Sequence, residues 1–267
     1  MTDKKFAVLG KPIGHSLSPT IHNAAYEQLG LNWSYERFEV GEGELRGFLE
    51  NKGSGLDGFS LTMPLKIEAA QVADFQDPLV SSIGIANTLV KEQGKLHAYN
   101  TDVFGISKAL QASWNEGVRQ IAILGSGATA QSALAAVHEH APSASVTVFV
   151  RDVSRTKDIV ELAAKVGLEL TLSNLEEFSN AQDLTVNTIP TNHLPIQPSQ
   201  QRGWLLDVNY SSADTKLSTS FDAARVVTGE VMLIWQAIAQ IRIFLTGDQT
   251  QELPDEARVL EVMRASL

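Results

Sequence analysis

The sequence predicts an α/β fold that contains a Rossmann-like, doubly wound parallel sheet. Two observations carry this prediction. A short apolar run at 120–124 ends in a glycine-rich turn that leads into a helix (QIAILGSGATA, 120–130), and short apolar runs alternate with helical segments along the chain, which is typical of parallel sheets. With 267 residues, the chain is long enough for two modest domains that each bury a core.

The first hundred residues alternate strands with helices and are predicted to form one unit. Ser18 suits the N-cap and Pro19 the first position of a helix that ends at Gly30. Gln93 and Gly94 suit the turn of a hairpin. We expect strands at 6–9, 33–38, 58–62, 88–91 and 96–99, and helices at 20–29, 45–52 and 65–72.

The rest of the chain continues this alternation. A helix at 102–112 leads into the strand at 121–124, and a second helix follows the glycine-rich turn at 128–139. The segment 229–245 has apolar residues at helical spacing. We expect further strands at 146–150, 169–172, 184–187, 204–207 and 225–227.

The glycine-rich turn stands in the context in which such turns bind a dinucleotide. Gly125 allows the tight turn, Gly127 lets the backbone approach a pyrophosphate, and Ala130 keeps the helix close to the strand. The N-terminus of the helix would face the phosphates. A tight strand-to-helix turn without a ligand is the alternative, and the context favours a nucleotide cofactor.

Composition excludes several classes of function. The absence of cysteine excludes disulfides, thiolate catalysis and cysteine-based zinc sites. The net charge of −10 argues against nucleic acid as a partner. No apolar run reaches the length of a membrane span, and the N-terminus lacks a secretory signal. We therefore expect a cytoplasmic protein.

The polar loop GKPIGHSLSP (10–19) feeds the N-terminus of the first helix. The hydroxyls of Ser16 and Ser18, with backbone N–H groups behind them, would suit a small carboxylate. For Ser18, a plain N-cap role is an equally good explanation. His15 has no partner at metal-ligand spacing, so we expect a local structural role for it and no metal site.

Several other side chains could take part in chemistry. Lys66 lies near the start of a helix, where positive charge is unfavourable, and its ammonium could exchange a proton with an alcohol. On spacing alone, a solvated surface lysine is the favoured alternative. Asp102 opens the next helix and fits a capping role equally well. Asn87 and Gln236 carry amides that could bind hydroxyls, and Tyr210 fits a half-buried ring as well as a binding role.

Together these strings resemble the shikimate dehydrogenase family, from Phe6 to about Gly247. Any one match would be weak, but the matches occur in the family's order along the chain. They are GHSLSP for H-S-x-S-P, SLTMPLK for N-[VL]-T-x-P-x-K, IGIANT for I-G-A-V-N-T, NTD, the glycine-rich turn, VNTIPT, the D-x-x-Y string at 207–210, and GEVMLIWQ for G-x-x-M-L-x-x-Q.

The resemblance implies reversible, NADP-dependent reduction of 3-dehydroshikimate to shikimate, a step of aromatic amino acid biosynthesis. It implies a substrate domain at 1–101, completed by C-terminal helices at 230–267, and a Rossmann-like NADP-binding domain at 102–229. Lys66 and Asp102 would form the catalytic pair, in which Lys66 moves the proton and Asp102 orients it. The residues implied to bind the substrate are Ser16, Ser18, Thr62, Asn87, Asp102, Tyr210 and Gln236. Those implied to line the cofactor site are Gly125, Ser126, Gly127, Ala128, Thr129, Arg151, Arg155, Val208 and Gly229.

The string VFVRDVSR indicates which nicotinamide cofactor is used. Arg151 and Arg155 suit the 2′-phosphate of NADP, and Ser154 could add a hydroxyl, whereas Asp152 would favour the ribose hydroxyls of NAD. Two guanidinium groups against one carboxylate favour NADP. A surface salt-bridge cluster is the alternative.

Four further positions depart from the family pattern: Ser60 in place of asparagine, Leu65 in place of an aromatic residue or histidine, Ala128 in place of a glycine, and Ser212 in place of a proline. None removes a catalytic group, but Ser60 could shift preference towards quinate or an amino analogue. The competing interpretations are an NAD-dependent quinate/shikimate dehydrogenase, a non-catalytic cofactor sensor and, less well supported, a folate-linked dehydrogenase. We expect a small-molecule carboxylate as the partner, and a monomer or homodimer.

Overall fold

The computed structural model describes residues 3–179, 182–189, 203–210 and 217–267. The chain divides into two compact units, one made of Met1–Thr101 with Leu233–Leu267 and the other of Asp102–Met232. The second boundary lies three residues after the expected one at 229/230. Mixed α/β architecture with two mostly parallel sheets confirms the predicted fold class.

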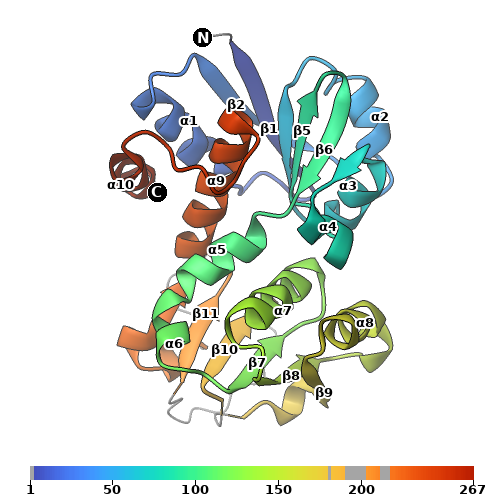
Figure 1. The fold of residues 1–267 in the computed structure, drawn as a ribbon, viewed down its shortest axis with the longest axis vertical. Coiled ribbons are helices and arrows are strands. Elements are labelled where there is room, and N and C mark those ends of the chain that lie inside the picture. Colours follow the sequence, from blue (N-terminus) through green and yellow to red (C-terminus); the bar gives the residue numbers. More distant parts are fainter. Residues whose placement is uncertain (1–2, 180–181, 190–202, 211–216) are drawn as a thin grey trace. The chain divides into compact units, whose positions relative to one another are not determined.

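The first unit contains a six-stranded mixed sheet in the order β2-β1-β3-β5-β6-β4 (Figure 1). Strand β1 pairs in parallel with β2 and β3, while β5 runs antiparallel to both β3 and β6. The short β4 pairs in parallel with β6. The strands are β1 (Lys4–Gly10), β2 (Trp33–Glu39), β3 (Gly58–Leu61), β4 (Phe75–Gln76), β5 (Thr88–Glu92) and β6 (Lys95–Tyr99).

Helices cover both faces of this sheet because its strands are apolar on both sides. Odd-numbered side chains of β1 and β3, such as Leu9 and Phe59, form one core with residues of α2, α3 and α4. On the even-numbered face, the Phe6 ring stacks on Phe244 of α9 at 4.1 Å between centroids and contacts Tyr26 of α1. The helices are α1 (Ser18–Gln28), α2 (Leu45–Glu50), α3 (Lys66–Val72), α4 (Pro78–Ile83), α9 (Gly229–Thr246) and α10 (Glu256–Ala265).

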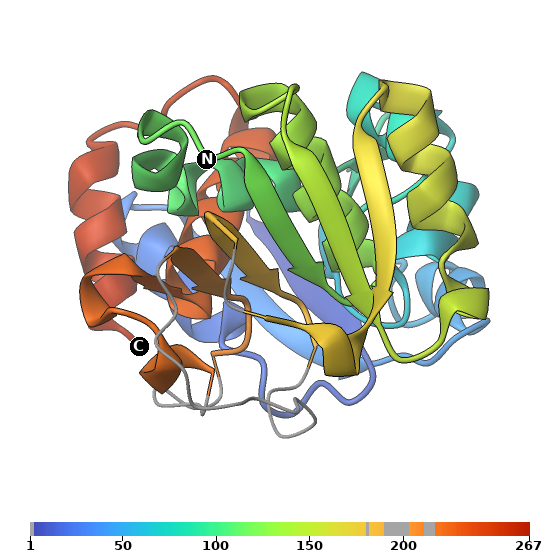
Figure 2. The same ribbon diagram turned by 90° about the horizontal axis from the view of Figure 1, so that it is seen from below.

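The second unit contains a six-stranded, fully parallel sheet in the order β12-β11-β10-β7-β8-β9. This is the doubly wound order, in which the chain reverses direction across the sheet between β7 and β10. Helices α7 and α8 lie side by side on one face (Figures 1 and 2). The strands are β7 (Gln120–Leu124), β8 (Ser145–Val150), β9 (Glu169–Asn174), β10 (Leu184–Asn187), β11 (Trp204–Asp207) and β12 (Val226–Thr228).

The helices of the second unit connect these strands or precede them. The α-helices are α5 (Asp102–Ala109), α6 (Gln111–Asn115), α7 (Ala128–His140) and α8 (Lys157–Val166). Short 3-10 helices occur at Val153–Arg155, Leu175–Glu177, Ser218–Ser220 and Ala223–Arg225. None of the helices in the described part of the chain combines the length and apolar character needed to cross a membrane.

The structure corrects several local predictions. Ser18 is not an N-cap: α1 already begins at Ser18, with Leu17 in the cap position and no side-chain cap. The helix expected at 102–112 is two helices, α5 and α6, with Leu110 between them. Helix α4 was not expected, although Asp77 marks its start by accepting a hydrogen bond from the Val80 N–H at 2.6 Å. The predicted hairpin turn at Gln93 and Gly94 is present, and both residues have positive φ.

Candidate functional site

Polar residues gather at one edge of the mixed sheet in the first unit. Strands β1 and β3 end at this edge, and antiparallel β5 begins there, because Ser60 pairs with Thr88 and Thr88 with Tyr99. The segments that leave or enter the sheet at this edge are therefore neighbours. They contain Ser16, Ser18, Thr62, Lys66, Asn87 and Thr101.

The loop after β1 packs closely on the loop after β3. The Lys11 N–H donates to the Met63 carbonyl O at 3.0 Å. A Cβ atom on Gly10 would collide with Thr62 Cγ2 and lie 2.9 Å from the Met63 carbonyl O. Only a glycine at position 10 permits this approach, so the loop that carries Ser16 is held beside Thr62.

Ser16 and Ser18 are both nearly buried at the start of α1. The Ser18 N–H lies 3.4 Å from Ser16 Oγ, which accepts from it, and the Ser16 N–H donates to the Ile13 carbonyl O at 3.0 Å. The two hydroxyls therefore stand two residues apart on a tightly turned backbone at a helix N-terminus. This arrangement suits an anionic oxygen ligand.

Lys66 is the first residue of α3 and is half-buried. Its carbonyl oxygen accepts a hydrogen bond from the Ala86 N–H at 2.9 Å, which ties the helix start to the segment just before Asn87. The Leu65 side chain, which departs from the family pattern, is fully buried in the core beneath this turn. The start of α3, which carries Lys66, is thus held in place at this edge of the sheet.

Asn87 lies buried between β5 and the end of β6. Its Oδ1 accepts hydrogen bonds from the Thr101 N–H at 2.8 Å and the Thr88 hydroxyl at 2.9 Å, and its Nδ2 donates to Thr101 Oγ1 at 2.9 Å. A backbone N–H can only donate, so Oδ1 and Nδ2 are assigned without ambiguity. The next residue after Thr101 is Asp102, a buried side chain in the first turn of α5.

The other two residues predicted to bind substrate belong to different parts of the fold. Gln236 lies on α9, nearly buried, and its Nε2 donates to the Leu233 carbonyl O at 2.7 Å. Tyr210 follows β11 in the second unit, where burial raises the pKa of its hydroxyl and keeps it a proton donor. Within the first unit, the structure brings the side chains from the loops after β1 and β3 to the same edge as Asn87.

The glycine-rich turn has the geometry that a dinucleotide site requires. Gly125 has φ +104°, and a Cβ atom there would lie 2.7 Å from both Thr188 Oγ1 and Ile189 Cγ2. Gly127 is the N-cap of α7, no side chain caps that helix, and Ala130 is fully buried against the sheet. The first N–H groups of α7 are thus presented beyond a turn made of backbone alone.

The remaining cofactor candidates lie at the same edge of the parallel sheet. Ser126 Oγ donates to the Arg155 carbonyl O at 3.2 Å. A Cβ atom on Gly229, at the junction of β12 and α9, would collide with the Val208 carbonyl O and lie 3.0 Å from that of Asp207. Ala128 and Thr129 form the first turn of α7. All nine candidates follow the carboxyl ends of β7, β8, β11 or β12, where ligands bind in doubly wound sheets.

The structure explains how the acidic residue Asp152 coexists with two arginines. Arg151 follows β8 directly, and Arg155 ends the 3-10 helix at Val153–Arg155; both are exposed. The Asp152 carboxylate accepts from the Ser154 N–H at 2.9 Å and the Ser154 hydroxyl at 2.6 Å, and these bonds lower its pKa. Asp152 is therefore engaged as the N-cap of its own 3-10 turn, with Ser154 as its hydrogen-bond donor, while the two guanidinium groups remain exposed.

Two polar clusters were not predicted from the sequence. At the ends of β10 and β11, Asp207 Oδ1 accepts from Asn187 Nδ2 at 3.0 Å and from Asn209 Nδ2 at 2.8 Å, and Asn209 Nδ2 also donates to the Ile189 carbonyl O. In the first unit, Ser60 and Gln240 share a buried hydrogen bond of 2.8 Å. The residues of the first cluster lie in the strings VNTIPT and D-x-x-Y, which served only as family matches, and no local pattern marks the second cluster. Ser212 lies outside the described residues.

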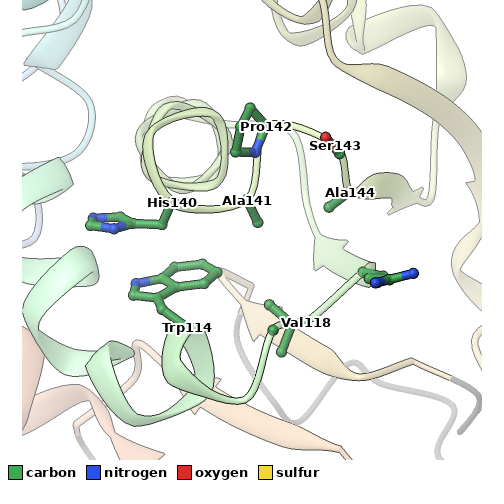
Figure 3. A pocket seen from close by; sticks show the side chains of 9 residues that line it. Trp114, Val118, His140, Ala141, Pro142, Ser143 and Ala144 are labelled. Atoms are coloured by element: carbon green, nitrogen blue, oxygen red, sulfur yellow. The ribbon is translucent and has the colours of Figure 1, made fainter.

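A hollow of about 430 Å³ in the second unit lies away from the carboxyl edge of the sheet. Its walls come from the segments that lead into β7 and β8, including Val118 and Ala144, so it is at the opposite, amino edge. Figure 3 shows the rings of Trp114 and His140 facing each other on one side of it, with centroids 5.3 Å apart. This hollow is separate from the cofactor candidates. Among the described residues, no group of three or more His, Asp or Glu side chains could hold a metal ion.

Comparisons with known proteins identify the family of this chain. The model of the shikimate dehydrogenase substrate binding domain matches residues 8–89. A shikimate dehydrogenase (NADP(+)) of Methanosarcina acetivorans is 31% identical over 97% of this chain and 99% of the relative. The chain belongs to the shikimate dehydrogenase family. The resemblance predicted from its motifs is confirmed.

Solved structures of this family share the fold. The crystal structure of Mycobacterium tuberculosis shikimate dehydrogenase is 33% identical to this chain, with a TM-score of 0.81. The match covers 99% of this chain and 100% of that enzyme's chain. The shikimate 5-dehydrogenase of Thermus thermophilus, solved with NADP(H) and shikimate, is 30% identical, with a TM-score of 0.77 and coverage of 99% and 100%. The fold of this family member is thus the one that those enzymes use.

Proposed function

We propose that this protein catalyses the reversible NADP-dependent reduction of 3-dehydroshikimate to shikimate. The observation that carries the proposal is the polar edge of the mixed sheet. The segments that meet at this edge carry Ser16, Thr62, Lys66 and Asn87, which supports a site that contains hydroxyls, an ammonium and a fixed amide. A carboxylate, ring hydroxyls and a carbonyl that must be protonated are the groups that such a set can bind.

The cofactor of this enzyme is NADP, as in the relatives named above. The residues fit it: the Gly125 turn has no room for a side chain, which leaves a backbone-lined approach to a pyrophosphate. Arg151 and Arg155 are exposed beyond β8, at the position where the adenosine ribose of a dinucleotide lies in this fold. We propose that they hold the 2′-phosphate through charge-assisted hydrogen bonds.

When bound, the nicotinamide supplies or accepts the hydride at the substrate carbon. The protein has to deliver a proton to the oxygen of that carbon in the reductive direction and remove it in the other. We assign this proton to Lys66, since a lysine ammonium is ordinarily charged at neutral pH and is a suitable donor. Asp102 is assigned the roles of orienting the ammonium and accepting a substrate hydroxyl.

The remaining residues bind and orient the substrate. We assign the carboxylate to Ser16 and Ser18, whose hydroxyls stand at the N-terminus of α1. Thr62, Asn87 and Gln236 are assigned to the ring, and Tyr210 is assigned as a further hydroxyl donor to the substrate. In this proposal the unit Met1–Thr101 with Leu233–Leu267 holds the substrate, and Asp102–Met232 holds NADP. We further propose that the protein acts in the cytoplasm as a monomer or homodimer.

Initial rates of the purified protein test the proposal. Shikimate and quinate are each offered with NADP and with NAD, and cofactor reduction is followed by absorbance. We expect turnover with shikimate and NADP to exceed that of the other three pairs by at least tenfold in kcat/KM. A preference for quinate or for NAD would replace the proposed substrate or cofactor. No turnover in any pair would contradict the proposed reaction.

A further inference from the structure

A continuous chain of hydrogen bonds runs through the buried interior of the first unit and ends on Asn87. The Tyr35 hydroxyl donates to Ser60 Oγ, and Ser60 Oγ donates to Gln240 Oε1 at 2.8 Å. Gln240 Nε2 donates to Thr88 Oγ1 at 3.0 Å, and Thr88 Oγ1 donates to Asn87 Oδ1 at 2.9 Å. The five side chains that these hydrogen bonds join are at most 5% exposed.

The direction of every bond in this chain is determined by two main-chain groups. Gln240 Nε2 also lies 3.3 Å from the Asn87 carbonyl O, which can only accept, so the amide nitrogen of Gln240 must point there. Gln240 Oε1 then has to accept the single proton of Ser60, and Ser60 has to accept from Tyr35. At the other end, the Thr101 N–H can only donate to Asn87 Oδ1.

The Gln240 side of these hydrogen bonds supports the same orientation of the Asn87 amide that the Thr101 N–H requires. Thr88 receives a hydrogen bond from Gln240 and gives its only proton to Asn87 Oδ1. If Gln240 lacked its amide, the Thr88 hydroxyl would lose the donor that fixes its rotation, and the Asn87 carbonyl O would lose one of its partners while keeping the Leu61 N–H at 2.8 Å. A buried polar group left in that state is costly and locally adaptable.

The titratable side chains around these hydrogen bonds keep one protonation state near neutral pH. Burial raises the pKa of Tyr35 far above neutrality, so its hydroxyl remains a donor. The His22 ring stacks on Tyr35 at 4.0 Å, and burial lowers its pKa to about 3, with the Gln240 side chain opposing the shift. The neighbouring Tyr26 hydroxyl faces His22 Nδ1 at 3.3 Å, and its pKa is also raised by burial. Tyr35, His22 and Tyr26 therefore keep one charge state near neutral pH.

We propose that Gln240 is a positioning residue for the substrate: through Thr88 and the Asn87 carbonyl it holds the Asn87 amide with Nδ2 as the donor towards one ring hydroxyl. This inference rests on the proposed function, in which Asn87 binds the ring. Gln240 does not touch substrate in this account. It acts from α9, one helical turn beyond Gln236, by fixing a residue that does. Ser60 donates to Gln240 Oε1 and so helps to hold the amide in this orientation, which gives its short side chain a role inside the protein.

The test compares two variants that interrupt the chain with one matched control. Gln240→Leu removes the amide at similar volume, and Thr88→Val removes the connecting hydroxyl with almost no change in shape. Tyr26→Phe removes a buried hydroxyl from the same region that is not part of the chain. We expect both test variants to raise KM for shikimate about tenfold, with kcat changed less than threefold and KM for NADP unchanged. Tyr26→Phe should leave all three constants within twofold.

Shikimate analogues that each lack one ring hydroxyl separate positioning from a general loss of structure. We expect the tenfold penalty in kcat/KM to disappear for one analogue and to persist for the others. A penalty equal for all analogues, or an unchanged KM for shikimate in both variants, would overturn the inference. If Gln240→Leu fails to fold, Thr88→Val alone decides. Absence of shikimate turnover in the unmodified protein would instead contradict the proposed function, so the two failures are distinguishable.

A rescue variant provides a second, independent readout. In Gln240→Ala the amide is lost, and Ser60→Asn supplies one from the facing strand β3. We expect the Ser60→Asn/Gln240→Ala protein to recover at least half of the lost affinity for shikimate on a logarithmic scale. A double variant no better than Gln240→Ala would show that the amide has to come from α9, and would remove Ser60 from the account.

Discussion

The two sheets of this protein present functional groups at one edge in different ways. In the second unit all strands are parallel, and the candidate cofactor site consists largely of backbone: the Gly125 turn, the start of α7 and the Gly229 junction. In the first unit β5 runs against its neighbours, and the edge carries side chains such as Lys66 and Asn87. A cofactor common to many enzymes can be bound by backbone geometry, whereas one particular substrate needs particular side chains.

The difference extends to what lies beneath each edge. Directly under the glycine-rich turn, residues 121–124 of β7 are apolar and at most 1% exposed, and the buried hydrogen bond between Asn187 and Asp207 lies at the ends of the neighbouring strands. Under Asn87, the interior contains Ser60, Thr88 and Gln240, joined by hydrogen bonds. Buried polar networks of this kind fix orientation but are costly when broken. We therefore expect variants of the first unit to change substrate recognition and variants of the second to change cofactor recognition.

The largest effect is expected at the proton donor. Lys66→Ala removes the proposed acid, and general acid–base catalysis typically contributes about 10²–10⁴-fold. We expect kcat for shikimate oxidation to fall about 10³-fold, with KM for NADP unchanged and KM for shikimate raised only modestly. Steady-state kinetics at saturating NADP measure this. Lys95→Ala, which removes an exposed lysine paired with Asp74 at 3.0 Å, is the control and should retain full activity. An unchanged kcat in Lys66→Ala would remove this residue from the mechanism.

The second largest effect concerns the 2′-phosphate. The double variant Arg151→Ala/Arg155→Ala should raise KM for NADP about 100-fold, because each guanidinium is assigned a charge-assisted bond to the phosphate. KM for NAD should change less than threefold, and KM for shikimate should stay constant. Asp152→Asn is the matched control, since its carboxylate is engaged by Ser154. Equal losses for NADP and NAD would assign the arginines to some other part of the cofactor or to stability.

A third prediction tests the backbone character of the cofactor edge. Gly125→Ala places a Cβ atom at 2.7 Å from Thr188 and Ile189 and forces φ +104° on alanine. Such a conformation costs about 1–3 kcal/mol, so we expect NADP affinity to fall about tenfold or more, measured by titration calorimetry. Gly55→Ala, at a site with open space around the added Cβ atom, should bind NADP normally. Unchanged NADP binding in Gly125→Ala would show that this turn adapts.

The smallest effect is the pH dependence of stability that the buried His22 of the first unit causes. Folded His22 takes up a proton only near pH 3, whereas in the unfolded chain it does so near its ordinary value of 6.5. Between these values the unfolded state binds more protons, so stability falls as the pH falls, by about 1.4 kcal/mol per unit. Urea unfolding at pH 7.5 and 5.5 should show a loss about 1.4 kcal/mol larger in the unmodified protein than in His22→Phe. His138→Phe, at an exposed histidine, should behave like the unmodified protein. Equal losses in His22→Phe and the unmodified protein would contradict a neutral, buried His22.

The contrast between the units also explains what could be predicted from sequence. Periodicity and glycine placement located the parallel strands well; β10 and β11 begin and end where expected. Motif order gave the family. The N-cap at Ser18 was wrong because serine suits both the cap and the first turn, and the choice depends on how the loop packs on Thr62 and Met63. The link between Ser60 and Gln240 joins residues 180 positions apart, and one sequence carries no signal for such a contact.

Crossed binding titrations test most directly whether the substrate and the cofactor bind at separate sheet edges. Asn87→Ala and the double variant Arg151→Ala/Arg155→Ala are each titrated separately with shikimate and with NADP by calorimetry. We predict that Asn87→Ala loses at least tenfold in affinity for shikimate and retains that for NADP. The arginine variant should lose NADP affinity by about 100-fold and retain that for shikimate. If either variant loses both ligands equally, or if the losses are exchanged, the assignment of substrate and cofactor to separate edges is wrong.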